Sequence, residues 1–134
     1  MKIFLSYKQT WLKINKLKLE LDFIKDVVSQ CWHEIYIHLF EKNKNSSSKY
    51  ILNKVKLEIE KSDLILWFVN NSEKSEWELL ELWIAEWMNK KILLLVNEKY
   101  REKFFLIYWL NTSILYYREV KEINNLLTNF LSWK

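Results

Sequence analysis

Two uninterrupted apolar runs, residues 64–69 and 92–96, restrict what this chain can fold into. Both are strand-sized and far shorter than the roughly 18 residues that span a bilayer. A strand that is apolar at consecutive positions has to be buried on both of its faces. Parallel sheets covered by helices on either side provide that burial. The runs therefore predict an α/β protein built around a parallel sheet.

Strand-like and helical patterns alternate along the whole chain. Strands are expected at 2–6, 33–40, 63–69, 91–96 and 113–117, and helices around 17–28, 51–59, 75–88, 98–108 and 120–130. Residues 16–21 also alternate polar and apolar, so a strand is the competing interpretation, but the helical spacing continues to Val28. Five βα units predict one domain, residues 1–134, with a flavodoxin-like, doubly wound, five-stranded parallel sheet in the order 2-1-3-4-5.

The composition is unusual, with no glycine, no proline and eight tryptophans. Average usage would supply roughly nine glycines. Trp11, Trp32, Trp87 and Trp109 fall at predicted turns or helix ends, where glycine is favoured because it tolerates positive φ. We hypothesise that UGA codons meaning glycine have been translated as tryptophan; the alternative is a genuinely tryptophan-rich protein. The codons at these positions decide between the two.

Charge and cysteine content exclude several classes of function. The net charge of +4 comes from lysines scattered among glutamates, which is typical of a solvated surface and does not require nucleic-acid binding. Cys31 has no partner for an internal disulfide, and His33 and His38 do not complete a zinc-type spacing. We expect no metal and no cofactor. The first residues lack the apolar segment of a secretory signal, so a cytoplasmic location without a membrane anchor is expected.

The predicted sheet places candidate binding residues together. Ligands of such sheets bind outside the carboxyl ends of the strands, where the winding direction reverses. The loops at 6–9 and 69–75 are expected to face each other there, with Ser6, Tyr7 and Asn70 among their residues. Ser75 begins the next helix, whose free N–H groups suit a phosphate or sugar oxygen. Ser75 and Glu78 also match a capping box, which stabilises a helix without any role in binding.

Residues 62–96 resemble the central motif of the nucleoside 2-deoxyribosyltransferase-like family. In that motif a strand that opens with Asp is followed by a loop, a helix reading S/D-x-G-x-x-x-E-L-G-x-A and a further strand. The positions that match in register are Ser75, Trp77, Glu81, Leu82, Trp83 and Ala85. With glycine at 77 and 83 the match becomes closer.

The resemblance implies a nucleoside or nucleoside 5′-monophosphate as the substrate and a homodimer or larger assembly. Glu81 would be the nucleophile that attacks the anomeric carbon, which divides N-glycosidic cleavage into two easier steps. Ser75 would help to hold a 5′-phosphate, Tyr7 would contact the base, and Trp77 would lie beside the substrate. From spacing alone, Glu81 could equally be one of several solvated glutamates on its helix.

The match departs from the family at one position. Family members carry an Asp about eight residues before the third strand, where this chain has Val55 in an apolar helix face. No residue is then an obvious general acid that could protonate the leaving base, although Lys8, Gln9 and Glu73 are expected nearby. His33 and His38 are expected to have packing or surface roles.

Two other functions remain open. The segments KIFLSYK and SEWELLEL also resemble TIR domains, which cleave NAD through a Glu on the equivalent helix or serve as interaction modules. A non-catalytic nucleotide-binding module is the other alternative.

Overall fold

The computed structural model describes residues 1–8, 13–40, 47–71, 75–102 and 112–132. Its centre is one parallel sheet of five strands in the order β2-β1-β3-β4-β5. The strands are β1 (Lys2–Tyr7), β2 (Glu34–Tyr36), β3 (Leu64–Val69), β4 (Lys91–Asn97) and β5 (Thr112–Tyr117). The predicted parallel sheet and its strand order are confirmed.

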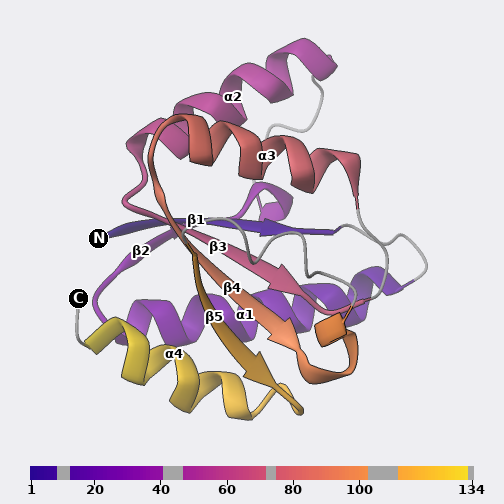
Figure 1. Ribbon diagram of the computed structural model, residues 1–134, viewed down its shortest axis with the longest axis vertical. Coiled ribbons are helices and arrows are strands. Elements are labelled where there is room, and N and C mark those ends of the chain that lie inside the picture. Colours follow the sequence, from indigo (N-terminus) through magenta and orange to yellow (C-terminus); the bar gives the residue numbers. More distant parts are fainter. Residues whose placement is uncertain (9–12, 41–46, 72–74, 103–111, 133–134) are drawn as a thin grey trace.

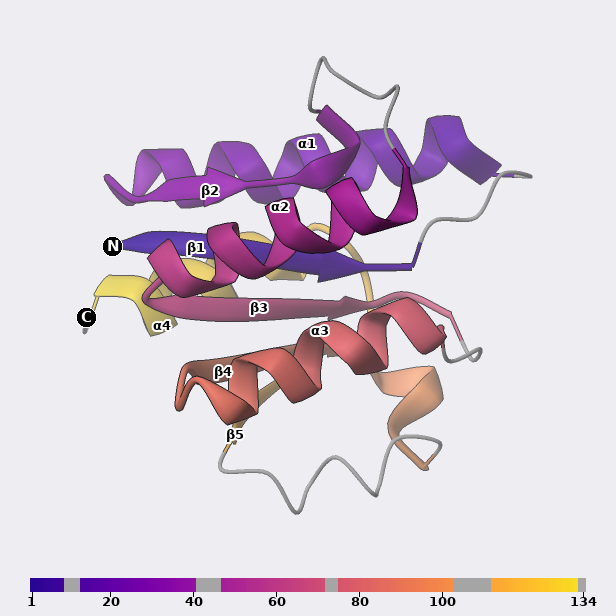
Figure 2. The same ribbon diagram turned by 90° about the horizontal axis from the view of Figure 1, so that it is seen from above.

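Helices cover both faces of this sheet, as Figure 1 shows. They are α1 (Ile14–Gln30), α2 (Ser48–Lys61), α3 (Glu76–Trp87) and α4 (Glu122–Ser132). One apolar core lies between the sheet and the α1–α4 pair, and a second lies under α2 and α3, which run side by side in Figure 2. Each strand supplies both cores because successive side chains point to opposite faces. The chain is a single-domain, doubly wound α/β protein of the flavodoxin-like kind.

Helix α1 confirms the choice of helix over strand for residues 16–21. Leu17, Leu21, Ile24 and Val28 are buried at the spacing of one helix face. At the start of α2, the Ser47 side chain caps the helix by accepting a hydrogen bond from the Tyr50 amide at 3.3 Å. Among the described residues, no helix is both long enough and apolar enough to cross a membrane.

The strand expected at 33–40 is wrong beyond Tyr36. The edge strand β2 pairs only with the first part of β1, and its register ends where Phe4 meets Tyr36. The chain then turns into a short 3-10 helix, His38–Phe40, which buries Leu39 in the core. Residues 98–102 are also 3-10 helix rather than α-helix, and the remainder of the helix expected at 98–108 lies outside the described residues.

The tryptophans occupy two kinds of environment. Trp32 follows α1 with a φ of 63°, the left-handed region, and its side chain is 94% exposed. Trp83 and Trp87 are also exposed, on the outer side of α3. Trp67 is instead fully buried in β3, where its indole N–H donates to a Glu78 carboxylate oxygen. Trp32 thus has the environment that favours glycine, whereas Trp67 fills the core; Trp11, Trp109 and Trp133 lie outside the described residues.

Replacing Trp32 by glycine is expected to raise the free energy of unfolding by about 1 kcal/mol, because a side chain is unfavourable at positive φ. Urea denaturation measures this change. The matched control is Trp87→Gly, since Trp87 is equally exposed but ends a helix without positive φ. That variant should gain nothing, because glycine disfavours a helix. Equal stability changes in the two variants would contradict the argument.

Candidate active site

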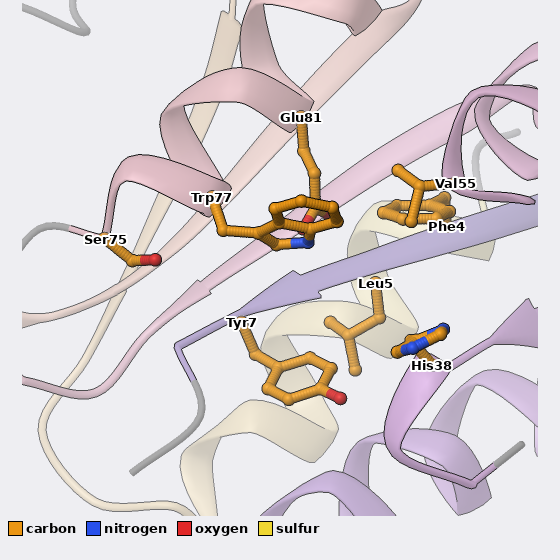
Figure 3. Close-up of a pocket in the computed structure, with 8 residues that line it drawn as sticks. All are labelled: Phe4, Leu5, Tyr7, His38, Val55, Ser75, Trp77 and Glu81. Atoms are coloured by element: carbon orange, nitrogen blue, oxygen red, sulfur yellow. The ribbon is translucent and has the colours of Figure 1, made fainter. Parts of the chain in front are cut away.

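A cavity of about 240 Å³ lies at the carboxyl ends of the central strands, between β1, α2 and α3 (Figure 3). It occupies the point where the winding of the sheet reverses, as expected for ligand sites of this fold. Its lining residues are Phe4, Leu5, Tyr7, His38, Val55, Ser75, Trp77 and Glu81. Four residues predicted to form the site therefore line one cavity: Tyr7, Ser75, Trp77 and Glu81.

Glu81 projects from α3 into this cavity and is only 5% exposed. Burial raises the pKa of its carboxyl well above the usual range; the Ser6 hydroxyl opposes that rise and the charge of Glu78 adds to it. The interpretation of Glu81 as a solvated glutamate is therefore wrong. Carboxyl groups with such a perturbed pKa are concentrated at functional sites.

Glu78 is a second buried acidic residue, which the sequence analysis treated only as part of a helix cap. It is 3% exposed; one carboxylate oxygen accepts from Trp67, and the other has no hydrogen-bond partner. Burial raises the pKa of Glu78 to about 7, against the opposing effects of Trp67 and Lys8. Since Glu78 reaches into the core and the Ser75 side chain makes no capping bond, the predicted capping box is wrong.

Tyr7 and His38 lie across the cavity from Glu81 (Figure 3). Burial, and to a lesser degree the charge of Glu81, raise the pKa of Tyr7, which keeps its phenol neutral. One nitrogen of His38, Nδ1, lies 3.1 Å from the Tyr36 hydroxyl, so Tyr36 fixes the orientation of the imidazole. His38 lines the cavity, a position that the expected packing or surface role did not specify. The strand expected at 33–40 contained His38, so no local signal indicated this position.

The remaining predicted residues lie around the cavity rather than in its lining. Ser6 is buried on the α3 side of β1, close enough to Glu81 to affect its ionisation. Asn70 directly follows β3, and its side chain lies on the opposite face of the sheet. Its amide nitrogen is there 3.4 Å from a carboxylate oxygen of Glu20 on α1. This follows from the alternation of side chains along β3. Gln9 and Glu73 lie outside the described residues.

The walls of the cavity limit what it can accept. Val55 places an apolar side chain against it, and the Trp77 indole occupies its other side. Ligand cavities commonly measure about 300–1,000 Å³, so the present space is small. Glycine at 77 would enlarge it beside Glu81. In the part of the chain that the structure describes, no three His, Cys, Asp or Glu side chains gather as metal ligands.

Comparison with known proteins finds likeness in structure rather than in sequence. No protein-family model and no curated protein matches the sequence. Several solved structures share the fold. One is the CMP N-glycosidase BcmB of Clostridium botulinum, with a TM-score of 0.77 and 20% identity over 97% of this chain and 99% of that one. A conserved protein of Enterococcus faecalis V583 has a TM-score of 0.65 at 10% identity, covering 96% and 98% of the two chains. A 2-deoxyribosyltransferase of Bacillus psychrosaccharolyticus has a TM-score of 0.60 at 14% sequence identity, covering 93% of this chain and 91% of that one.

Proposed function

We propose that this chain is a nucleoside 2-deoxyribosyltransferase-like domain that cleaves the N-glycosidic bond of a nucleoside or nucleoside 5′-monophosphate, with Glu81 as nucleophile. The observation that carries the proposal is the buried Glu81 carboxyl in the cavity at the reversal point of the sheet. Two proteins of the same fold, an N-glycosidase acting on CMP and a deoxyribosyltransferase, support this class of reaction.

The proposed reaction has two steps. In the first, the ionised carboxylate of Glu81 attacks the anomeric carbon, the carbon–nitrogen bond breaks, and its electron pair leaves with the base. In the second, water or another base attacks the same carbon and Glu81 departs as a carboxylate. Water gives a hydrolase, and a second base gives a transferase.

We propose that His38 donates the proton that the leaving base needs. It lies across the cavity from Glu81, so a sugar between them would present its base to the imidazole. Imidazole exchanges protons near neutral pH, and general acid catalysis needs such a group. His38 would take the role for which the family uses the Asp that Val55 replaces here.

The binding roles follow the same placement. Tyr7 is proposed to contact the base, while Ser75 and the N–H groups at the start of α3 would hold a 5′-phosphate. Ser6 would orient Glu81, and position 77 would lie against the sugar. Homodimer formation stays a prediction, which light scattering in solution tests.

Chromatographic detection of free base tests the proposed function. The substrates are nucleosides, their 5′-monophosphates and NAD, each incubated with the printed chain and with a chain that carries glycine at the seven tryptophan positions other than 67, where the indole fills the core. Base release from a nucleoside or monophosphate supports the proposal. Cleavage of NAD alone would favour the TIR-like alternative, and no release from any substrate would contradict both.

His38→Gln is expected to slow base release from ordinary nucleosides by roughly 100-fold, the lower range for general acid catalysis. The same variant should cleave 7-methylguanosine at close to the unaltered rate, because that base is cationic and leaves without a proton. Steady-state kinetics on both substrates measure the difference. Equal slowing on both would show that His38 shapes the cavity and does not donate a proton.

A nucleotide-binding module is the second candidate, because Val55 gives the cavity an apolar wall where a carboxylate would serve catalysis. Thermal stabilisation by a nucleoside monophosphate that is never cleaved would favour it.

A further inference from the structure

Glu78 and Glu81 lie three residues apart on α3, and both side chains are buried on its inner side. Side chains at this spacing are neighbours on a helix surface, with about 5–6 Å between their Cβ atoms. Two carboxylates so close in a medium of low polarity are not both ionised at neutral pH. The charge of Glu78 accordingly opposes ionisation of Glu81.

Trp67 and Lys8 oppose the rise in the pKa of Glu78 without cancelling it. Tyr7 and His38 face Glu81 across the cavity, and Lys8 lies on the side of Glu78. On α2, which packs against α3, Glu58 bonds instead to Lys2 and Lys54 at 2.8 and 3.1 Å. The Trp67 indole N–H holds one oxygen of Glu78, and the other oxygen, without a partner, remains able to take a proton.

We propose that Glu78 is a positioning residue that shares one proton with Glu81 and accepts it when Glu81 attacks the sugar. This inference rests on the proposed function. It gives the buried Glu78 a role that neither the helix cap nor the cavity lining explains.

The transfer balances within the site. The proton passes from the Glu81 carboxyl to the Glu78 carboxylate, and the Glu81 oxygen then uses its electron pair to bond the anomeric carbon. When water or a second base later releases the sugar, Glu81 leaves as a carboxylate and recovers its proton from Glu78. The pair carries one negative charge before the attack and none while the glycosyl ester exists, and it regains that charge when Glu81 is released, so the proton stays within the pair and does not have to cross to solvent.

The test measures kcat/KM of Glu78→Gln and of the unaltered protein from pH 5.5 to 9. The quantity followed is the ratio of the value for the variant to the value for the unaltered protein. The contribution of His38 cancels in this ratio. The unaltered pair loses its first proton near pH 7 and then changes little, because burial raises the pKa of Glu78 to about 7. In the variant, Glu81 has to lose its own proton to solvent. The ratio should stay flat below pH 7 and rise with pH above it, because burial raises the pKa of the Glu81 carboxyl well above its usual range.

Two further variants make the result specific. Glu78→Asp keeps a carboxyl group and should give a flat ratio, as should Glu76→Gln, which alters an exposed glutamate on the same helix. A lowered but flat ratio for Glu78→Gln would overturn the proposal and leave Glu78 a packing role. That result differs from failure of the proposed function, in which the unaltered protein releases no base at all.

Discussion

Glu81→Gln is expected to lower the rate of base release by about 1,000-fold or more. The amide has nearly the size of the carboxyl group and preserves the packing of a side chain that is 5% exposed. It cannot form the glycosyl ester, however, and it carries no charge to stabilise an oxocarbenium-like transition state. Loss of a nucleophile commonly costs several orders of magnitude in kcat. Chromatography of released base under single-turnover conditions measures the effect.

The matched control for Glu81→Gln is Glu86→Gln, an exposed glutamate on the same helix. It should keep the full rate, which separates a local effect from a general effect of charge on α3. Intact-mass measurement during turnover adds a second readout, because the sugar adduct should form on the control and be absent from Glu81→Gln. Base release by Glu81→Gln at the unaltered rate would contradict the assignment of the nucleophile.

The free energy of unfolding is expected to fall by ~3 kcal/mol between pH 5 and pH 8.5. Burial raises the pKa of Glu78 from its ordinary value to about 7. A carboxyl with a raised pKa in the folded state contributes fully to stability below its unfolded pKa. It loses that contribution as pH rises through 7. Glu81 acts in the same direction, because burial also raises its pKa.

Glu78→Gln should remove the part of that loss that comes from Glu78, so the variant gains ~3 kcal/mol over the unaltered protein at pH 8.5 and less at pH 5. The glutamine oxygen can still accept the Trp67 N–H. Urea denaturation at the two pH values measures the gain, with Glu76→Gln as the exposed control on the same helix. A gain of equal size at both pH values would show that packing, and not ionisation, is responsible.

The sheet could be predicted because its strands are apolar at consecutive positions and alternate with helical spacing. The expectation of a strand failed after Tyr36, where the β-branched and aromatic residues of 33–40 continue into a 3-10 helix. Local pattern does not show that β2 is an edge strand whose pairing ends with Phe4. The end of that strand depends on its neighbour, which no window of sequence contains.

For the candidate site, sequence reasoning found the residues that a motif or a loop position identifies. It missed His38 and Glu78, whose roles depend on tertiary contacts with Tyr36 and Trp67. Glu78 has the same local pattern as the exposed Glu76 and Glu86, and only the direction of the helix face distinguishes them. Alternation along β3 shows only that Asn70 and Trp67 face opposite sides of the sheet, and the side that carries the cavity is set by tertiary packing.

The pairing of β1 with β3 joins Tyr7 to Phe68, residues about sixty positions apart in the chain. Contacts of such separation form late and slow folding, because a long loop has to close first. The cavity between β1, α2 and α3 therefore cannot exist in a partly folded chain that contains only local structure. A ligand that binds there should slow global unfolding and protect amides throughout the central strands from hydrogen exchange, not only those that it touches.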